Sequence, residues 1–240
     1  LAFADFLRLL VEGLDVFHVP DHPFLRPGGT TMNDSNMVPQ APLDRDAELD
    51  RLDGIVRDAL RQARRLGADE ADVHASASQG LSVNVRLGEV ETLEYMQDRG
   101  VSVTVYSGRR KGTASSADLQ PESIAECVRR AADIARYTQE DPCNGLADPG
   151  LLAREQPDLD LWHPVAMDAT AAIERAQACE EAGRSDGRIS NSEGAGFEAA
   201  LGLSVYGNSN GFIGRSAGTR YTQSCILLAG EGEGMQRDYA

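Results

Sequence analysis

Aromatic and basic residues are scarce in this sequence. Aromatic residues make up 5% of the 240 residues, so the core has to be built mainly from aliphatic side chains and alanine. There are 23 lysines and arginines against 38 acidic residues, which gives a formal net charge of −15 at pH 7. Because nucleic-acid binding needs clustered basic side chains for the phosphates, this balance argues against nucleic acid as a direct ligand. The acidity is typical of a soluble cytoplasmic protein.

Cysteines are few and lie far apart. They are Cys127, Cys143, Cys179 and Cys225. None has a second cysteine at the short spacing of a zinc ribbon or of a CxxC redox motif. A disulfide framework needs a higher density of cysteines, so we predict reduced thiols, as in the cytoplasm.

The motifs of common catalytic centres are also missing. There is no GxSxG nucleophile elbow, no GxGxxG dinucleotide motif and no GxxxxGK[ST] phosphate loop. His18 and His22 have helical spacing, but Pro20 lies between them and prevents a shared helix face. His74 falls on the outer face of an expected strand, and His163 has no local partner. The sequence therefore predicts no catalytic residue and no metal ligand in this chain.

The N-terminal stretch does not have the pattern of a targeting or membrane segment. Residues 1–17 are apolar but contain acidic side chains, and they lack the basic start and the cleavage site of a signal peptide. They are too short and too charged to cross a membrane, so no membrane partner is expected. We predict that residues 1–40 form a flexible or non-native extension and that translation begins at Met32 or Met37. Since the sequence stops just after a polar turn, we also expect a chain that is truncated.

Residues 41–140 show the pattern of a first α+β domain. Apolar residues at three-and-four spacing predict a helix over residues 44–66, capped by Asp44 or Asp46 and ended by Gly67. Pro121 suits the first position of a second helix over residues 121–137. Between the helices, apolar and polar residues alternate, which predicts an antiparallel meander with one face on a core.

The meander is expected to contain five strands. Their ranges are 73–77, 81–87, 89–96, 101–107 and a short strand within 108–116. Gln79–Gly80, Gly88 and Asp98–Gly100 are the expected turns, because glycine and aspartate favour turn conformations. The basic run Arg109–Lys111 is typical of a solvated turn.

A linker and a second domain are expected after the meander unit. Residues 141–165 contain four prolines and are predicted to be the linker. Residues 166–240 are predicted to form a second α+β region, with a helix over 167–182 that ends at Gly183. Antiparallel hairpins follow, and this second domain is expected to be incomplete.

Two short stretches are candidate contact sites for a peptide or a partner. Asn210–Gly211 predicts a hairpin with a type I′ turn, which requires positive φ at both central residues. The stretch Asn208, Ser209, Asn210, Gly211 carries more hydrogen-bonding groups than such a turn needs. Arg237 and Asp238 form either a salt-bridged turn or part of a functional surface.

Several pieces of the sequence together resemble the TldD/PmbA family, known as modulators of DNA gyrase. The pieces are VRLGEVE, GVSVTVYSGRRKGTASSADLQPESI, DPCNGLAD, SEGAG, NSNGF and GTRYTQSCILLAGEGEGMQRDY. Their order is that of the family from about residue 44 onward, and NSNGF and MQRDY resemble the PmbA (TldE) branch. Gln120 departs from the family, which has a serine at this helix start.

The resemblance implies a cytosolic metallopeptidase of two subunits that acts in proteolysis. The TldD subunit of the family carries zinc on an HExxxH helix, in the half beyond what this sequence covers, and the PmbA subunit lacks those ligands. The chain would then be the N-terminal half of a PmbA-like subunit without a cofactor of its own. Zinc would be on a TldD-like partner, and the pair would enclose a chamber for unfolded peptides such as peptide-antibiotic precursors and antitoxins.

Two alternatives stay open. The first is a metallopeptidase that is active alone, with its zinc ligands beyond residue 240. The second is a protein-binding module without enzymatic activity. No residue of this chain matches the zinc motif, so none is assigned as catalytic or metal-binding from the resemblance.

Overall fold

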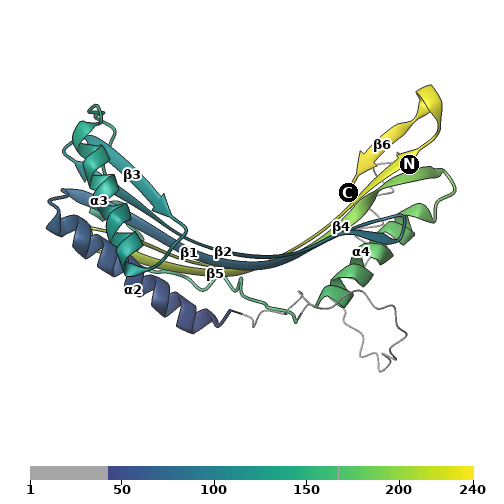
Figure 1. Cartoon of the computed structure of the whole chain (residues 1–240), viewed down its shortest axis with the longest axis horizontal. Coiled ribbons are helices and arrows are strands. Elements are labelled where there is room, and N and C mark those ends of the chain that lie inside the picture. The colour runs from purple at the N-terminus through teal and green to yellow at the C-terminus, as the bar shows by residue number, and fades with distance from the viewer. Residues whose placement is uncertain (1–42, 167) are drawn as a thin grey trace.

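The computed structural model describes residues 43–166 and 168–240, and the predicted extension at residues 1–40 lies outside them. In the described part, three α-helices accompany one six-stranded sheet (Figure 1). The helices are α2 (Arg45–Arg65), α3 (Pro121–Tyr137) and α4 (Ala169–Arg184). The strands are β1 (Glu70–Arg86), β2 (Glu89–Ser107), β3 (Arg110–Ser116), β4 (Ile189–Asn208), β5 (Ile213–Ala229) and β6 (Gln236–Tyr239). The predicted α+β class is confirmed.

All three predicted helices are present. α2 begins after Asp44, whose carboxylate accepts a hydrogen bond from the backbone N–H of Ala47 at 3.1 Å; such a cap stabilises a helix by about 1 kcal/mol. α3 begins at Pro121, as predicted. The predicted end of the last helix at Gly183 is wrong, because Gly183 lies inside α4. A Cβ at this position would come within 2.5 Å of the Leu227 side chain, so the glycine permits close packing on β5.

Two predicted turns within the meander are wrong. Gln79–Gly80 lies inside β1, and Asp98–Gly100 lies inside β2, so four expected strands are two long ones. Gly80 is paired with Met96 on one side and with Ala200 on the other, and this pairing keeps β1 extended. The expected turn at Gly88 is confirmed: Leu87 and Gly88 have φ values of 53° and 84° and connect β1 to β2.

The strands form one antiparallel sheet in the order β3-β2-β1-β4-β5-β6. β1 pairs with β4 from Asp72 opposite Asn208 to Val85 opposite Ala195. The strands of the predicted first region and those of the second region therefore share one hydrogen-bonded sheet. A division of the chain at residues 141–165 stays a prediction.

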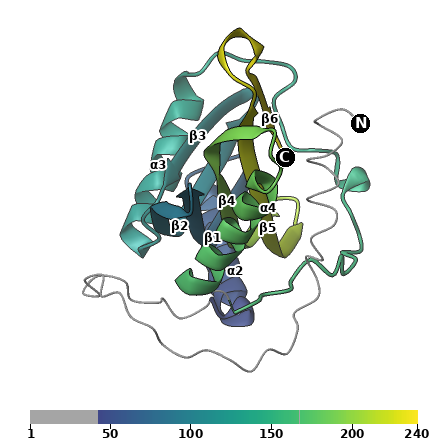
Figure 2. The same cartoon turned by 90° about the vertical axis from the view of Figure 1, so that its right-hand side faces the viewer.

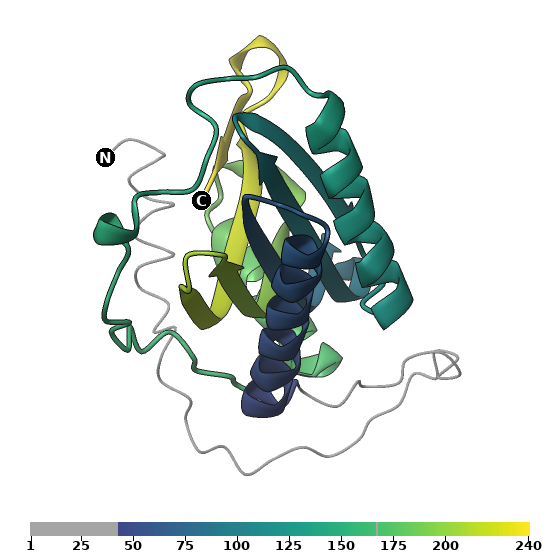
Figure 3. The same cartoon turned by 90° about the vertical axis from the view of Figure 1, so that its left-hand side faces the viewer.

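The long strands bend strongly, so the sheet has a convex and a concave face (Figure 1). α2 and α3 cover the convex face at one end, as Figure 3 shows. α4 covers the convex face at the other end, in front of β4 and β5 (Figure 2). Among the described residues, no helix lies on the concave face.

Two apolar clusters on the convex face hold the helices to the sheet. The larger cluster joins α2 and α3 to the strands and includes Leu52, Val56, Val73, Val103 and Val128. The smaller cluster joins α4 to the strands and includes Val83, Val85, Ala176, Phe197 and Leu227. Burial of each large aliphatic side chain contributes about 1.5–3 kcal/mol to folding, so the convex side carries most of the stabilising contacts. Aliphatic residues and alanine, rather than aromatic residues, make up most of both clusters, as predicted.

Candidate functional site

The concave face of the sheet is the candidate functional site. Side chains alternate between the two faces of a strand, and the buried residues of β1 all have odd numbers from Ala71 to Val85. The even-numbered side chains therefore point to the concave side. They are Asp72, His74, Ser76, Ser78, Gly80, Ser82 and Asn84.

These even-numbered residues of β1, which we call its concave row, differ from the residues of an ordinary solvent-facing strand surface, where long charged side chains are favoured. Five of the seven residues in this row are serine, glycine or asparagine. The paired rows continue this composition with Ser102 and Gly100 on β2 and with Ser204 and Gly202 on β4. Short side chains leave the backbone of the sheet close to anything that lies in the concavity, and they offer hydroxyl groups as donors and acceptors.

A polar cluster lies at the α2/α3 end of this face. The hydroxyl of Tyr106 donates a hydrogen bond to the Asp72 carboxylate at 3.4 Å. Burial and the nearby Asp72 raise the pKa of Tyr106 to about 12. Burial also raises the pKa of Asp72, although hydrogen bonds from Thr104 and Tyr106 oppose the rise. At neutral pH the phenol therefore keeps its proton and acts as a hydrogen-bond donor rather than as a nucleophile.

The candidate stretch Asn208, Ser209, Asn210, Gly211 lies at the same end and forms the tip of the β4–β5 hairpin. A hairpin is confirmed here, but the expected type I′ turn is wrong. The N–H of Gly211 donates to the carbonyl of Asn208 at 3.1 Å, and Gly211 has a φ of +91°. Neither Ser209 nor Asn210 has a positive φ. These features are typical of a three-residue loop that ends in a left-handed glycine.

Most hydrogen-bonding groups of this tip are used within the chain. The Asn208 side chain accepts from the N–H groups of Asn210 and Phe212 at 3.1 and 3.2 Å. The Ser209 hydroxyl accepts from the N–H of Ala71 at 3.0 Å. The tip therefore closes the sheet end, with Asn208 buried and Ser209, Asn210 and Gly211 exposed. Contact with a peptide or partner stays a prediction for this stretch.

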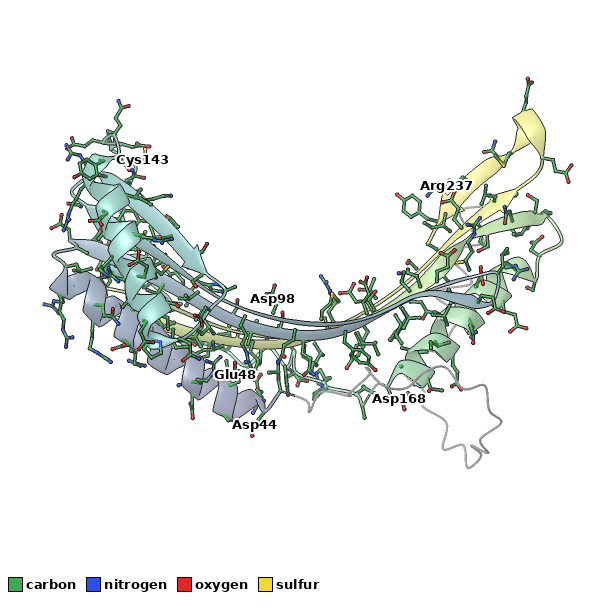
Figure 4. All side chains as sticks on the ribbon, viewed as in Figure 1. Asp44, Glu48, Asp98, Cys143, Asp168 and Arg237 are labelled. Carbon is green, nitrogen blue, oxygen red and sulfur yellow. The ribbon has the colours of Figure 1, made fainter. Side chains whose placement is uncertain are left out.

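Arg237 and Asp238 lie at the opposite end of the sheet, on β6 (Figure 4). Arg237 forms an ion pair with Glu193 at 2.8 Å, so it ties β6 to β4. The Asp238 carboxylate accepts a hydrogen bond from the N–H of Tyr239. The structure thus places the two candidate stretches at opposite ends of the concave face and does not bring them together.

The sequence analysis did not predict two buried carboxylates on the convex side. Asp53 of α2 accepts hydrogen bonds from Arg57 and from Arg215 of β5, the latter at 2.6 Å. Burial alone would raise the pKa of Asp53, but these two arginines outweigh it and lower the pKa. Asp53 lies next to Leu52 on the buried side of the helix, and an acidic residue within an apolar stripe is the signal that could have identified it.

Glu180 of α4 is the second of these carboxylates and is 1% exposed. It accepts hydrogen bonds from the N–H groups of Leu87 and Gly88, both at 2.8 Å. Burial would raise the pKa of Glu180, but bonds from Ser192 and from these two backbone groups lower it. The carboxylate therefore fixes the tip of the β1–β2 hairpin to α4, a structural role.

A hollow of about 390 Å³ lies on the convex side, between the start of α2 and the segment 156–162. Its lining includes Leu49, Trp162 and Arg215. The N–H of Thr219 on β5 donates to the carbonyl of Leu161 at 2.8 Å, which holds the segment against the sheet. This hollow is separated from the concave face by the sheet itself.

Residues 43–166 and 168–240 contain neither a cluster of metal ligands nor a membrane-spanning helix. No three histidine, cysteine, aspartate or glutamate side chains gather there in a way that could hold a metal ion. The residues therefore do not fit a zinc site, and no chemical step of this chain is derived from a metal. None of the helices in this part is long and apolar enough to span a membrane. Cys127, Cys179 and Cys225 are buried free thiols, and Cys143 is an exposed one.

Family models match both halves of the described chain. Residues 71–135 match the PmbA/TldA metallopeptidase domain 1, and residues 162–240 match the PmbA/TldA metallopeptidase central domain. The first range covers β1 to most of α3, and the second covers α4 and the remaining strands. Both halves of the sheet, and hence its concave face, belong to the family pattern.

Curated relatives carry the PmbA name. The Metalloprotease PmbA of Escherichia coli O157:H7 is 45% identical over 190 residues, which are 78% of this chain and 42% of that protein. The Metalloprotease PmbA homolog of Haemophilus influenzae is 40% identical over 182 residues, or 75% of this chain and 40% of that protein. The chain thus spans less than half the length of these relatives.

Solved structures share the fold. A protein of Bacteroides thetaiotaomicron described as a modulator of DNA gyrase matches with a TM-score of 0.71 and 26% identity, covering 79% of this chain and 44% of that one. TldE of Thermococcus kodakarensis matches with a TM-score of 0.60 and 16% identity, covering 76% of this chain and 42% of that one. The second likeness concerns the fold alone. From the two family models and the PmbA relatives we conclude that the chain belongs to the PmbA/TldD metallopeptidase family.

Proposed function

We propose that this chain belongs to a PmbA/TldE-like subunit of a cytoplasmic TldD/PmbA metallopeptidase complex that degrades unfolded peptides. The observation that carries the proposal is a concave face that no helix of residues 43–166 and 168–240 covers, in a chain 45% identical to a Metalloprotease PmbA. Its short polar side chains suit contact with the backbone of an extended peptide, which is the same for every sequence. The substrates we propose are peptide-antibiotic precursors and labile antitoxins.

In this proposal the concave face of the chain holds the peptide through hydrogen bonds, and the partner carries the metal that acts in cleavage. In residues 43–166 and 168–240 no three histidine, cysteine, aspartate or glutamate side chains gather as metal ligands, and we assign the zinc to a TldD-like subunit. The concave face then forms one wall of a chamber that the partner closes. Nucleic acid has no place in this account, because the net charge of −15 opposes phosphate binding.

Coexpression of the full-length protein with a TldD-like protein from the same genome tests the proposal. We expect the two proteins to elute together in size-exclusion chromatography, with zinc measured by mass spectrometry on the partner only. Cleavage of an unfolded peptide should require both proteins. Stoichiometric zinc and cleavage with the PmbA-like protein alone would overturn the assignment.

A second candidate function is a metallopeptidase that is active without a partner. It is favoured by the names of the curated relatives, which call the PmbA proteins themselves metalloproteases. The zinc ligands would then lie beyond residue 240. Reading the gene past the codon of Ala240 separates the two candidates, because an HExxxH motif there favours the second.

A further inference from the structure

One long stretch of β2 has an edge with no paired strand in the described part of the chain. β3 pairs with β2 only from Val101 to Ser107, whereas β2 extends from Glu89. Residues 89–100 therefore have β1 on one side and, among the described residues, no strand on the other. The N–H and C=O groups that point outward from an edge strand are a template for another extended chain.

The side chains of β2 are more exposed where no described strand lies beside it than where β3 pairs with it. From Val101 to Val105 every second residue of β2 is buried, whereas none of residues 89–100 is buried. Val90, Tyr95 and Met96 are large apolar side chains that remain 38%, 38% and 42% exposed. A stretch of twelve residues is roughly 40 Å long at the rise of a β-strand. This edge has the length to pair with a peptide of about ten residues.

The edge borders the concave face. Met96 lies opposite Gly80, and a Cβ on Gly80 would come within 3.2 Å of the Met96 methyl group. Met96, Glu94 and Asp98 share the concave side because alternate residues of a strand share a face. Figure 4 shows Asp98 on this side at the middle of the sheet. A chain added along the edge would continue the concave face by one strand.

The charges of the edge indicate what kind of chain would add to it. Residues 89–100 contain four acidic side chains and one arginine. Glu91 is paired with Arg86 at 3.8 Å, and Arg99 is paired with Glu48 at 3.5 Å. Among the described residues, Glu89, Glu94 and Asp98 form no ion pair. Charged edges also discourage uncontrolled pairing of strands, but the three uncompensated carboxylates favour an incoming chain with basic side chains.

We propose that the edge of β2 at residues 89–100 binds an unfolded peptide with basic side chains, which adds to the sheet as a further strand. A second copy of this chain is disfavoured because its own acidic edge would face the first one. The inference rests on the proposed function for the nature of the ligand. Peptide binding at the β2 edge needs neither the partner nor the metal. This inference and the proposed function can therefore fail separately.

The test uses the full-length protein and three synthetic peptides of ten residues. The first alternates lysine with threonine and valine, the second has glutamate in place of lysine, and the third is the first with every backbone nitrogen methylated. Fluorescence anisotropy at low salt should show binding of the lysine peptide at least tenfold tighter than of the other two. Methylation of every backbone nitrogen removes the backbone donors along both edges of the peptide while leaving its charge unchanged, so equal binding of the methylated peptide overturns strand addition.

A pair of matched variants locates the binding site. Glu94→Lys with Asp98→Lys should weaken binding of the lysine peptide about tenfold, because each exposed ion pair contributes up to about 1 kcal/mol and reversal adds repulsion. Glu231→Lys with Glu233→Lys changes the net charge equally, on exposed residues near β6, and should leave the affinity within twofold. An equal loss in both variants would show attraction by net charge alone and overturn the assignment.

Hydrogen exchange supplies the remaining control. We expect fast exchange of the outward-pointing amides at residues 89–100 in the free full-length protein and slow exchange after the lysine peptide is added. Slow exchange before addition would mean that another part of the protein, or a folded partner, already covers the edge, and the proposal would be wrong. If the lysine peptide binds the β2 edge but the complex with a TldD-like partner has no peptidase activity, the result would instead count against the proposed function.

Discussion

The two faces of the sheet are made from the same strands but have opposite chemistry. On β1, the odd-numbered residues between Ala71 and Val85 are almost all valine, alanine or leucine, and they lie beneath helices. The even-numbered residues are mainly serine, glycine and asparagine, and no described helix covers them. One strand thus serves a core on one side and an open surface on the other.

The difference shows where this fold tolerates change. The convex side is packed, and two charged groups within it, Asp53 and Glu180, are each held by several hydrogen bonds. The concave side has few large side chains to pack, so its composition is free to serve binding. Substitutions on the convex face should therefore change stability, and substitutions on the concave face should change function.

The largest effect is expected for Gly112→Val on β3. A Cβ at Gly112 would lie 2.1 Å from the carbonyl oxygen of Ala131 in α3, and this backbone atom cannot move away alone. Such overpacking should lower the free energy of unfolding by about 3 kcal/mol. Ser115→Val, on the concave side of the same strand, should change it by less than about 0.5 kcal/mol. Urea unfolding measures both, and equal losses would contradict the contrast between the faces.

The next effect is expected for Asp53→Ala. The substitution leaves Arg57 and Arg215 without their buried partner, but both arginines are partly exposed, so we expect a loss of about 2 kcal/mol. Asp98→Ala on the concave side is the control and should cost less than about 0.5 kcal/mol.

This prediction also has a pH dependence. The pKa of Asp53 is lowered in the folded state, so its stabilisation is complete above the unfolded value of about 3.9 and is lost as the pH falls through the lower folded pKa. The stability difference between the wild type and Asp53→Ala should shrink when urea titrations are moved from neutral to strongly acidic pH. A difference that grows under acid would refute the role of the carboxylate.

A smaller effect is expected for Glu180→Gln. The amide oxygen can still accept from one of the N–H groups of Leu87 and Gly88, but the charge is lost and the amide nitrogen then faces a donor. We expect a loss of about 1–2 kcal/mol, which lowers the melting temperature by about 2–8 °C in a protein of this size. Glu94→Gln, on the concave side, should leave the melting temperature within about 1 °C. Calorimetry compares the two.

The smallest effect on stability is expected for Ser78→Trp, in the middle of the concave face. The indole would project into open space, so the free energy of unfolding should change by less than about 0.5 kcal/mol. In the complex with a TldD-like partner, the same change should slow cleavage of an unfolded peptide about tenfold, because it fills the peptide path, a cost of about 1.4 kcal/mol. Arg61→Trp, on the exposed side of α2, is the matched control and should leave cleavage unchanged.

Local patterns in the sequence predicted the helices well. The apolar stripe of residues 44–66 and the proline at 121 are local signals. Asp44 caps the first helix with its side chain, and Pro121 at the first helical position favours the second, where Gln120 makes no cap hydrogen bond. The strands were found, but Gly80 and Asp98–Gly100 were taken as turns because these residue types favour turns in isolation. In the folded chain, pairing with neighbouring strands outweighs that preference. The apolar residues keep odd numbers on both sides of Gln79, from Ala71 to Val85, and this continued register was the signal against a turn.

The candidate site depends on contacts that no local pattern encodes. The pairing of β1 with β4 brings together residues more than one hundred positions apart in the sequence, and helices pack on the convex face at both ends of the bent sheet (Figure 1). The stretch Asn208–Gly211 was identified as a hairpin tip, but its distance from Arg237 is a property of the whole sheet. The open edge of β2 was hidden because the sequence suggested a turn at Asp98–Gly100.

Photo-crosslinking in the assembled complex tests the central claim most directly, namely that the concave face meets the peptide. An unfolded peptide carrying benzoylphenylalanine is bound to the full-length protein and its TldD-like partner, irradiated, and the linked residues are identified by mass spectrometry. We expect crosslinks to the concave side, from His74 to Asn84 on β1 and at their paired neighbours on β2 and β4. Crosslinks confined to the outer faces of α2, α3 and α4, or to the partner alone, would contradict it.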